Sequence, residues 1–237
     1  MSSKTTQIMA TAAKPTEATR VAARLRDEIV RGVVRPGTKL KLVPLAQRYE
    51  VGRGPLREAA CRLASEGLVV IEEQRGFRVA PISRRDLIDV TRTRQRIEGL
   101  AVRDAIAHGQ LEWEGEILSA LHVLARGSAT AASAAGRESF ARRHRAFHAA
   151  LCAACPSTYL LQFRAMLYAH TERYRCLAAD AYRERRDRGR EVFAEHEALA
   201  EAVVARDAER ACALLDEHLQ RTADTLLASY PELFEEA

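Results

Sequence analysis

The spacing of apolar residues changes near residue 80, and this change restricts the fold more than any other feature of the sequence. Up to Ala80 the chain shows three short segments with helical spacing, then two β-rich runs joined by a polar turn. Beyond Pro81 no strand signal occurs, and segments with helical spacing continue to about residue 229. Helical spacing and strict alternation distinguish amphipathic helices from strands. The sequence therefore predicts a mostly α protein with two domains.

The N-terminal segments predict three helices followed by a β-hairpin. Val21, Leu25 and Ile29 lie on one face of a first helix, which begins near Ala18 and stops at Gly32. The other expected elements are helices at 43–49 and 53–65 and strands at 68–71 and 77–79.

The C-terminal part predicts an all-α bundle, with Ser83 as N-cap of its first helix and Asp207 as N-cap of its last. The low-complexity stretch 127–136 predicts a flexible loop. The expected helices cover about 84–107, 111–126, 136–154, 157–182, 189–205 and 208–229. The expected domains are a disordered tail at 1–16, a DNA-binding unit at 17–80, a linker at 81–83 and a helical domain at 84–231.

The charge is unevenly distributed, although the net charge is only +5. Residues 1–80 hold 15 basic and 8 acidic side chains, whereas residues 81–237 hold 22 and 24. No apolar run is long enough to span a membrane, and the start of the chain lacks the apolar stretch of a signal peptide. Five cysteines in helix-like sequence indicate reduced thiols. These features predict a cytoplasmic protein with a basic N-terminal segment and no membrane partner.

Three short helices and a hairpin on a basic segment predict a winged helix-turn-helix domain. In such a domain the third helix enters the major groove, and the hairpin tip reaches the neighbouring backbone or minor groove. Two arginines four residues apart share one face of this helix, which could also be a solvated basic face. The basic hairpin tip favours DNA. The residues predicted to contact double-stranded DNA are Arg53, Gly54, Arg57, Gln74, Arg75 and Gly76.

The stretch IVRGVVRPGTKLKLVPLAQRYEVGRGPLREAACRLASEGLVVIEEQRGFRVAPIS resembles the DNA-binding domain of GntR-type bacterial transcription regulators. The resemblance covers about residues 18–83 and many positions agree in register. Two positions depart from the family pattern. Gly52 stands where Ser or Thr usually caps the recognition helix, and Val43 replaces an Arg that contacts DNA in some members.

Four histidines predict a metal site in the helical domain. His144 and His148 are four residues apart, so both rings can face one ion. His196 lies 11 residues before Asp207 and His218 lies 11 after it, so both stand about 16 Å from the turn of a helical hairpin. Imidazole nitrogens suit a divalent transition metal such as Zn²⁺ or Ni²⁺. A pair of surface histidines was the alternative for His144 and His148 alone.

Residues 84–230 resemble the all-helical FCD effector domain found in one branch of these regulators. Many such domains hold a divalent metal between one Asp and three His, and His144 stands at the Asp position here. Ser157 replaces the Asn usual in the following loop. The matching motifs are RxxxE (Arg94, Glu98), FHxxL (Phe147, His148, Leu151), EHxxL (Glu195, His196, Leu199) and a final HL (His218, Leu219).

The resemblance implies a homodimeric transcription regulator, more often a repressor, and not an enzyme. Neutral histidines leave the metal charge uncompensated, which favours a small carboxylate effector. Arg94 is the effector-binding candidate by its motif, with an ion pair to Glu98 as the equal alternative, and Arg173 is a candidate on spacing. Two other functions stay open: a metal-dependent hydrolase-like enzyme, and a regulator whose metal is purely structural.

Overall fold

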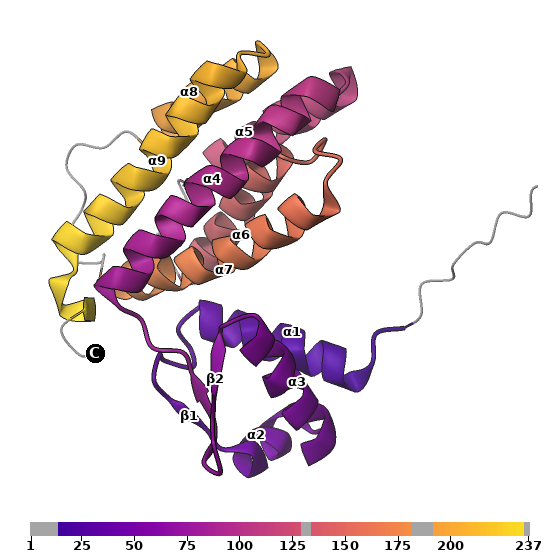
Figure 1. Ribbon diagram of the computed structural model, residues 1–237, viewed down its shortest axis with the longest axis vertical. Helices are drawn as coiled ribbons and strands as arrows, with labels where there is room; N and C mark the ends of the chain where they lie inside the picture. Colours follow the sequence, from indigo (N-terminus) through magenta and orange to yellow (C-terminus); the bar gives the residue numbers. More distant parts are fainter. Residues whose placement is uncertain (1–13, 129–133, 182–191, 235–237) are drawn as a thin grey trace, which may run out of the picture. The chain divides into compact units, whose positions relative to one another are not determined.

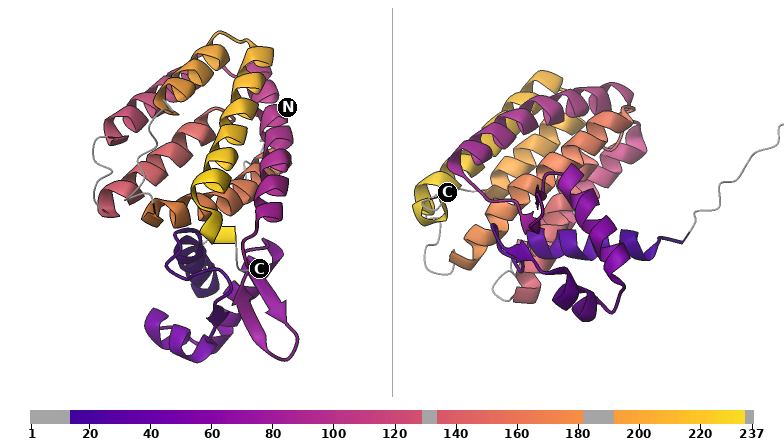
Figure 2. Two further views of the ribbon diagram at one scale, coloured as in Figure 1. Left: turned by 90° about the vertical axis from the view of Figure 1, so that its left-hand side faces the viewer. Right: turned by 60° about the horizontal axis from the view of Figure 1, so that its bottom comes forward.

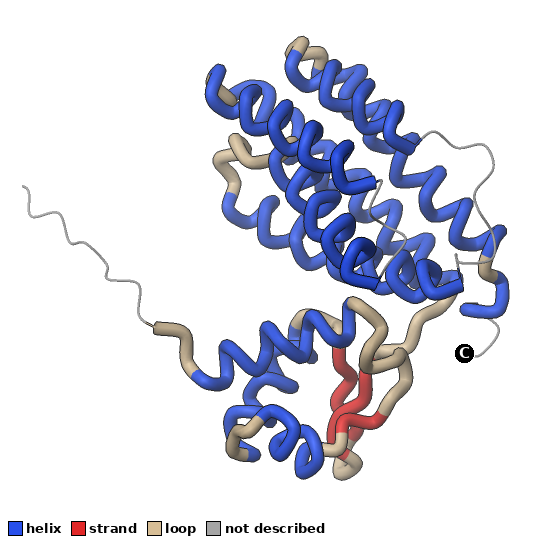
Figure 3. The backbone as a smooth tube through the Cα atoms, turned by 180° about the vertical axis from the view of Figure 1, so that it is seen from behind, coloured by secondary structure: helices blue, strands red, loops and turns tan. Residues whose placement is uncertain are grey.

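The computed structural model describes residues 14–128, 134–181 and 192–234. The chain forms two compact units that divide between Ala80 and Pro81, except that residues 30–32 group with the second unit. Helices predominate, and among the described residues the strands lie only in the N-terminal unit (Figures 1 and 3). The predicted fold class, a winged helix-turn-helix followed by an all-α bundle, is confirmed. Among the described residues, no helix combines the length and apolar character needed to cross a bilayer.

The N-terminal unit contains three helices and a small antiparallel sheet. Its order is α1 (Glu17–Val30), β1 (Lys39–Leu40), α2 (Leu42–Tyr49), α3 (Arg53–Ser65), β2 (Val69–Glu72) and β3 (Gly76–Val79). The sheet order is β1-β3-β2, and Val70 pairs with Arg78 across the hairpin. The sequence analysis missed β1, because two residues are too few to show an alternating pattern.

The apolar face of α3 anchors the N-terminal unit. Leu56, Ala60 and Leu63 are fully buried, as their helical spacing predicts, and they pack with Leu25 of α1 and Phe77 of β3 in one core. Because this face is fixed against the core, the opposite face of α3 is held toward solvent.

The C-terminal unit is a bundle of long helices in its described part. They are α4 (Arg84–His108), α5 (Leu111–Ser128), α6 (Ala134–Ala150), α7 (Thr158–Ala181), α8 (Val192–Val204) and α9 (Ala208–Ser229), followed by the 3₁₀ helix η1 (Pro231–Phe234). Helix α4 packs against α7 and α9, α5 packs against α6 and α8, and α8 lies beside α9 (Figure 2). Both predicted caps are present: Ser83 Oγ accepts a hydrogen bond from Asp86 N at 3.0 Å, and Asp207 Oδ1 accepts one from Arg210 N at 3.0 Å.

Two predictions for this unit are wrong. Helix α6 ends at Ala150 instead of residue 154, and the chain continues through tight turns such as Cys155 N to Cys152 O at 3.0 Å. The backbone amides bond three residues back from Cys152 onward, as Cys152 N does to Ala149 O at 3.2 Å, so the segment after Ala150 is more tightly wound than an α-helix. The loop expected at 127–136 is shorter, since residues 127–128 and 134–136 are helical. Alanine, frequent in this stretch, favours helix.

The remaining differences concern the edges of elements. Residues 129–133 of the predicted loop, residues 1–13 of the predicted tail and residues 189–191 of the predicted helix at 189–205 lie outside the described residues. The η1 turn was not predicted.

Gly109, at the junction between α4 and α5, has no space for a side chain. A side chain at Gly109 would collide with the buried indole of Trp113, whose Nε1 donates to Ala150 O at 2.8 Å. Gly109→Ala should therefore destabilise the protein by about 1–3 kcal/mol, as overpacking does. Gly115→Ala is the matched control, because this exposed glycine lies inside α5 with open space around it, and alanine should stabilise the helix by about 1 kcal/mol. Thermal unfolding measures both, and equal melting temperatures for the two variants would contradict the prediction.

Candidate functional site

Four histidine side chains converge inside the helical domain. His144 and His148 come from α6, His196 from α8 and His218 from α9. Each offers one ring nitrogen, and these four atoms all lie within 4.8 Å of one another. The exposed fraction of each residue is 6% or less. The rings therefore form one buried cluster, as the sequence spacing predicts.

The ring spacings show how the helices bring the cluster together. The ring centroids of His144 and His148 are 4.5 Å apart, as expected for neighbours on one helix face, and those of His196 and His218 are 4.7 Å apart across the α8–α9 hairpin. The two pairs also meet, with 5.0 Å between His144 and His196 and 5.2 Å between His148 and His218. The Asp207 turn therefore places its two histidines level with each other, and α6 closes the cluster.

Burial favours the neutral form of His144 and His148. It lowers the pKa of His144 and His148 well below the ordinary histidine value, because a buried charge loses its hydration. The positive charge of Arg175 lowers the pKa of His144 further, and the neighbouring His218 and His196 do the same for His148. Neutral imidazole is the form that binds a metal ion.

Hydrogen bonds distinguish three of the rings. His218 Nδ1 lies 2.8 Å from Glu195 Oε2, and a neutral ring can donate from Nδ1 to this carboxylate and keep a lone pair on Nε2. His148 has no hydrogen bond at either nitrogen, although the ring is only 1% exposed. His144 differs, because Arg175 Nη1 can only donate and lies 2.9 Å from its Nδ1. The lone pair of His144 Nδ1 is therefore already engaged.

Arg94 makes the ion pair that the sequence analysis left as an alternative. Its guanidinium lies 2.7 Å from Glu98 Oε1 and donates to Thr171 Oγ1 at 2.7 Å. Both members of the pair are buried, and Arg94 Cζ lies 5.1 Å from the ring centroid of Tyr168. Tyr168 in turn reaches His144 through its hydroxyl at 3.1 Å, so Arg94 lies close to the histidine cluster.

Arg173, the second effector candidate, is buried in a different environment. Burial lowers the pKa of its guanidinium, while electrostatic interactions with Tyr174 and Asp86 act in the opposite direction. Tyr174 belongs to the apolar cluster around Leu87 and Tyr230, and its hydroxyl lies 2.6 Å from Asp86 Oδ2. The described contacts of Arg173 therefore point toward the start of α4, and its role in effector binding stays a prediction.

Sequence reasoning missed the α7 side chains beside the cluster. Arg164, Tyr168, Thr171 and Arg175 recur at i, i+4, i+7 and i+11, which places them on one helix face. The helical spacing of these polar residues could have identified this face of α7 from the sequence. The contact between Glu195 and His218 could not be predicted in this way, because the two residues are 23 positions apart and belong to different helices.

The predicted DNA-contacting residues lie on two exposed parts of the N-terminal unit. Arg53, Gly54 and Arg57 are exposed in the first turns of α3, where Gly52 is an N-cap without a side-chain bond. Gln74 and Arg75 are exposed in the turn between β2 and β3, and Gly76 is the exposed first residue of β3. Gln74 and Gly76 have φ values of +56° and +94°, so this turn needs a left-handed backbone, which glycine adopts readily. Each predicted DNA contact is therefore accessible to a ligand.

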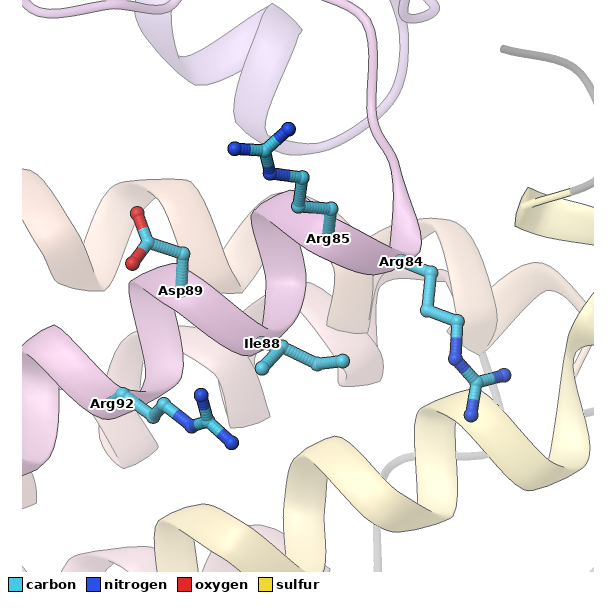
Figure 4. Close-up of a pocket in the computed structure, with 5 residues that line it drawn as sticks. All are labelled: Arg84, Arg85, Ile88, Asp89 and Arg92. Atoms are coloured by element: carbon cyan, nitrogen blue, oxygen red, sulfur yellow. The ribbon is translucent and has the colours of Figure 1, made fainter.

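A hollow of about 570 Å³ lies at the start of α4, lined by Arg84, Arg85, Ile88, Asp89 and Arg92. Figure 4 shows Arg84, Ile88 and Arg92 along one side of the helix, with Arg85 and Asp89 on another. The arginines and Asp89 are exposed, so water solvates their charges. This hollow is separate from the histidine cluster, none of whose residues line it.

The winged helix-turn-helix and the all-α domain together define a DNA-binding transcription regulator. Residues 17–79 match the model of the bacterial regulatory proteins of the gntR family, and residues 89–221 match the FCD domain. The chain therefore belongs to the GntR family of transcription regulators, in the group that carries an FCD domain. These regulators are not enzymes, so the hydrolase alternative is not supported.

Relatives and solved structures agree with this assignment. The HTH-type transcriptional repressor GlaR of Escherichia coli strain K12 is 38% identical over 82% of this chain and 89% of its own length. The uncharacterized HTH-type transcriptional regulator BphR of Paraburkholderia xenovorans strain LB400 is 37% identical over 83% of this chain and 80% of its own. The structure of E. coli McbR/YncC has a TM-score of 0.75 and 22% identity, covering 91% of this chain and 99% of that one, which shows a common fold.

Proposed function

We propose that the chain is a homodimeric repressor whose affinity for operator DNA is controlled by a small carboxylate bound at a divalent metal in the histidine cluster. The main support for the metal site is the environment of His148. This ring is buried and has no hydrogen bond at either nitrogen. A buried polar atom without a partner is unfavourable, and a metal ion would satisfy it. GlaR, a relative over most of the chain, is named a repressor, which supports that direction of control.

The histidines fit a metal to different degrees. His148, His196 and His218 are buried and within reach of one point, and Glu195 orients His218. His144 would be a fourth ligand only after its Nδ1 is released from Arg175. Zn²⁺ or Ni²⁺ suits such imidazole ligands. The bound metal would supply a positive charge that the neutral rings do not compensate, and an anionic effector would then complete its coordination.

Arg94 is the proposed effector contact, and it links the site to the DNA-binding unit along the chain. It lies on α4, which begins at Arg84, and the last strand of the wing ends at Val79. An effector that attracts the Arg94 guanidinium would compete with Glu98 and bias the position of α4. In a two-fold dimer that reads two half-sites, such a bias would change operator affinity.

The proposed DNA interface is the exposed start of α3 together with the wing tip. Arg53 and Arg57 share one face of the first turns of α3, where backbone amides also favour phosphate. Arg57 Cζ lies 5.8 Å from the ring centroid of Phe77, so a side chain of β3 contributes to the position of this guanidinium. Phosphate and base contacts from such a helix are typical of winged helix-turn-helix proteins.

Arg57→Ala tests the interface. The variant should bind the operator about 10- to 100-fold more weakly, because it loses a contact worth about 1–3 kcal/mol. Arg62→Ala is the matched control: it removes the same charge from the last turn of α3, where Arg62 pairs with Glu58, and should have a smaller effect. Fluorescence anisotropy with operator DNA at constant salt measures both. Unchanged affinity for Arg57→Ala would exclude this residue from the interface.

His148→Ala tests the metal site. The variant should lose its stoichiometric metal, because the ring with no competing hydrogen bond is removed from the ligand set. Elemental analysis of the full-length protein measures the metal content, and His122→Ala, at an exposed position on α5, should retain the metal. A His148→Ala protein with full metal content would rule out the proposed ligand set.

A purely structural metal is the remaining alternative, and thermal unfolding separates it from a sensor. A chelator should lower the melting temperature in both cases, because metal bound only to the folded state stabilises it. A carboxylic acid should raise the melting temperature of the metal-loaded protein only if the site is a sensor. A screen in which no acid changes the melting temperature or operator affinity would favour the structural role.

A further inference from the structure

Arg164 of α7 is a buried arginine whose hydrogen-bonding groups are only partly used. Its side chain is 6% exposed, yet neither Nε nor Nη2 makes a hydrogen bond. Buried guanidinium groups are normally paired and fully hydrogen-bonded, because they lose their hydration. Among the described residues, no acceptor is within hydrogen-bonding distance of these two groups, so both remain available to a ligand.

The ion pairs around Arg164 leave a positive charge in excess. The carboxylate that pairs with it is Glu98, whose Oε2 lies 3.9 Å from Arg164 Nε, beyond hydrogen-bonding distance. Glu98 is already held by Arg94 at 2.7 Å. Arg175, further along α7, has its own partner in Glu172 at 2.9 Å. Two buried arginines, Arg94 and Arg164, thus share one carboxylate.

The neighbouring thiol does not compensate this charge. Burial raises the pKa of Cys152, which interacts electrostatically with Arg164, to about 12, so the thiol is neutral at physiological pH.

Arg164 lies near the histidine cluster, because the ring of Tyr168 is close to both Arg164 and His148. The ring centroid of Tyr168 is 5.8 Å from Arg164 Cζ and 6.4 Å from the ring centroid of His148. The sum of these distances limits the separation between Arg164 and His148 to about 12 Å. A ligand with two anionic groups a few carbon atoms apart can span such a separation, because each group also extends by about 3 Å to its partner.

We propose that Arg164 binds a second carboxylate of the effector, so that the effector is a short dicarboxylate with one carboxylate at the metal and the other at Arg164. This inference rests on the proposed metal-bound carboxylate. A planar guanidinium with two available N–H groups matches a carboxylate in bidentate geometry. A monocarboxylate would satisfy the metal and leave Arg164 as it is.

The first measurement compares acids of equal chain length. Zn²⁺-loaded full-length protein is titrated calorimetrically with the dicarboxylates from malonate to adipate and with the monocarboxylate of the same carbon number. For the best-fitting length, the dicarboxylate should bind about 10- to 100-fold more tightly, as expected for one charge-assisted bidentate contact. Equal affinities within every pair would overturn the inference and leave the proposed carboxylate sensor intact.

The second measurement uses variants of Arg164. Arg164→Met should abolish the preference for the dicarboxylate and keep the affinity for the monocarboxylate. Without any acid, its melting temperature should equal or exceed that of the wild type, because an uncompensated buried charge is removed. Arg164→Lys, which keeps the charge and loses the planar fork, should retain part of the preference. A full preference in Arg164→Met would overturn the inference.

Arg145→Met is the matched control. Arg145 Cζ lies 5.6 Å from the same Tyr168 ring, but the residue is exposed and its charge is solvated, so the preference should be unchanged. If no acid of either kind binds the wild-type protein, the carboxylate sensor fails, and the assignment of Arg164 fails with it. If Arg164→Met does not fold, the inference is tested by the dicarboxylate and monocarboxylate affinities of the wild-type protein and of Arg164→Lys.

Discussion

Four imidazole rings occupy one enclosed space, and the helical domain is organised around this constraint. A protonated ring is strongly disfavoured there, because burial removes its hydration and Arg175 adds a second positive charge. The rings come from α6, α8 and α9, so the cluster can form only when these three helices have their native placement. The packing that lowers the pKa of His144 and His148 also leaves these two rings in the neutral form that binds a metal ion.

Beside this space two buried arginines, Arg94 and Arg164, share a single carboxylate, so their positive charge is not fully balanced. Glu98, Glu172 and Glu195 each hold a partner, but Glu98 serves two arginines. Burying such an excess is unfavourable for an isolated chain and favourable for a complex with an anion, so the region favours binding over maximal stability. An anionic effector would therefore connect the proposed metal ligands and the α7 arginines in a single site.

Much of the architecture could be predicted from sequence because periodicity and caps are local signals. The level placement of His196 and His218 follows from counting residues on either side of Asp207. The end of α6 was misplaced, because helical spacing in the sequence continues through residues 151–154, where the backbone forms tight turns. The buried arginines were harder to find, since the chain has 33 arginines and sequence alone does not separate Arg164 from the exposed ones. Burial of a charged side chain depends on contacts between distant segments, which local patterns do not record.

The short connection between α8 and α9 also bears on how the site is assembled during folding. Only three residues separate Val204 from Ala208, whereas His148 lies 48 residues before His196. Closing a short loop costs less chain entropy than closing a long one. We therefore expect His196 and His218 to meet early as a two-ligand half-site, with α6 arriving later to complete it. A newly made chain could capture an ion loosely at first and enclose it only when the bundle closes, which makes metal uptake part of folding.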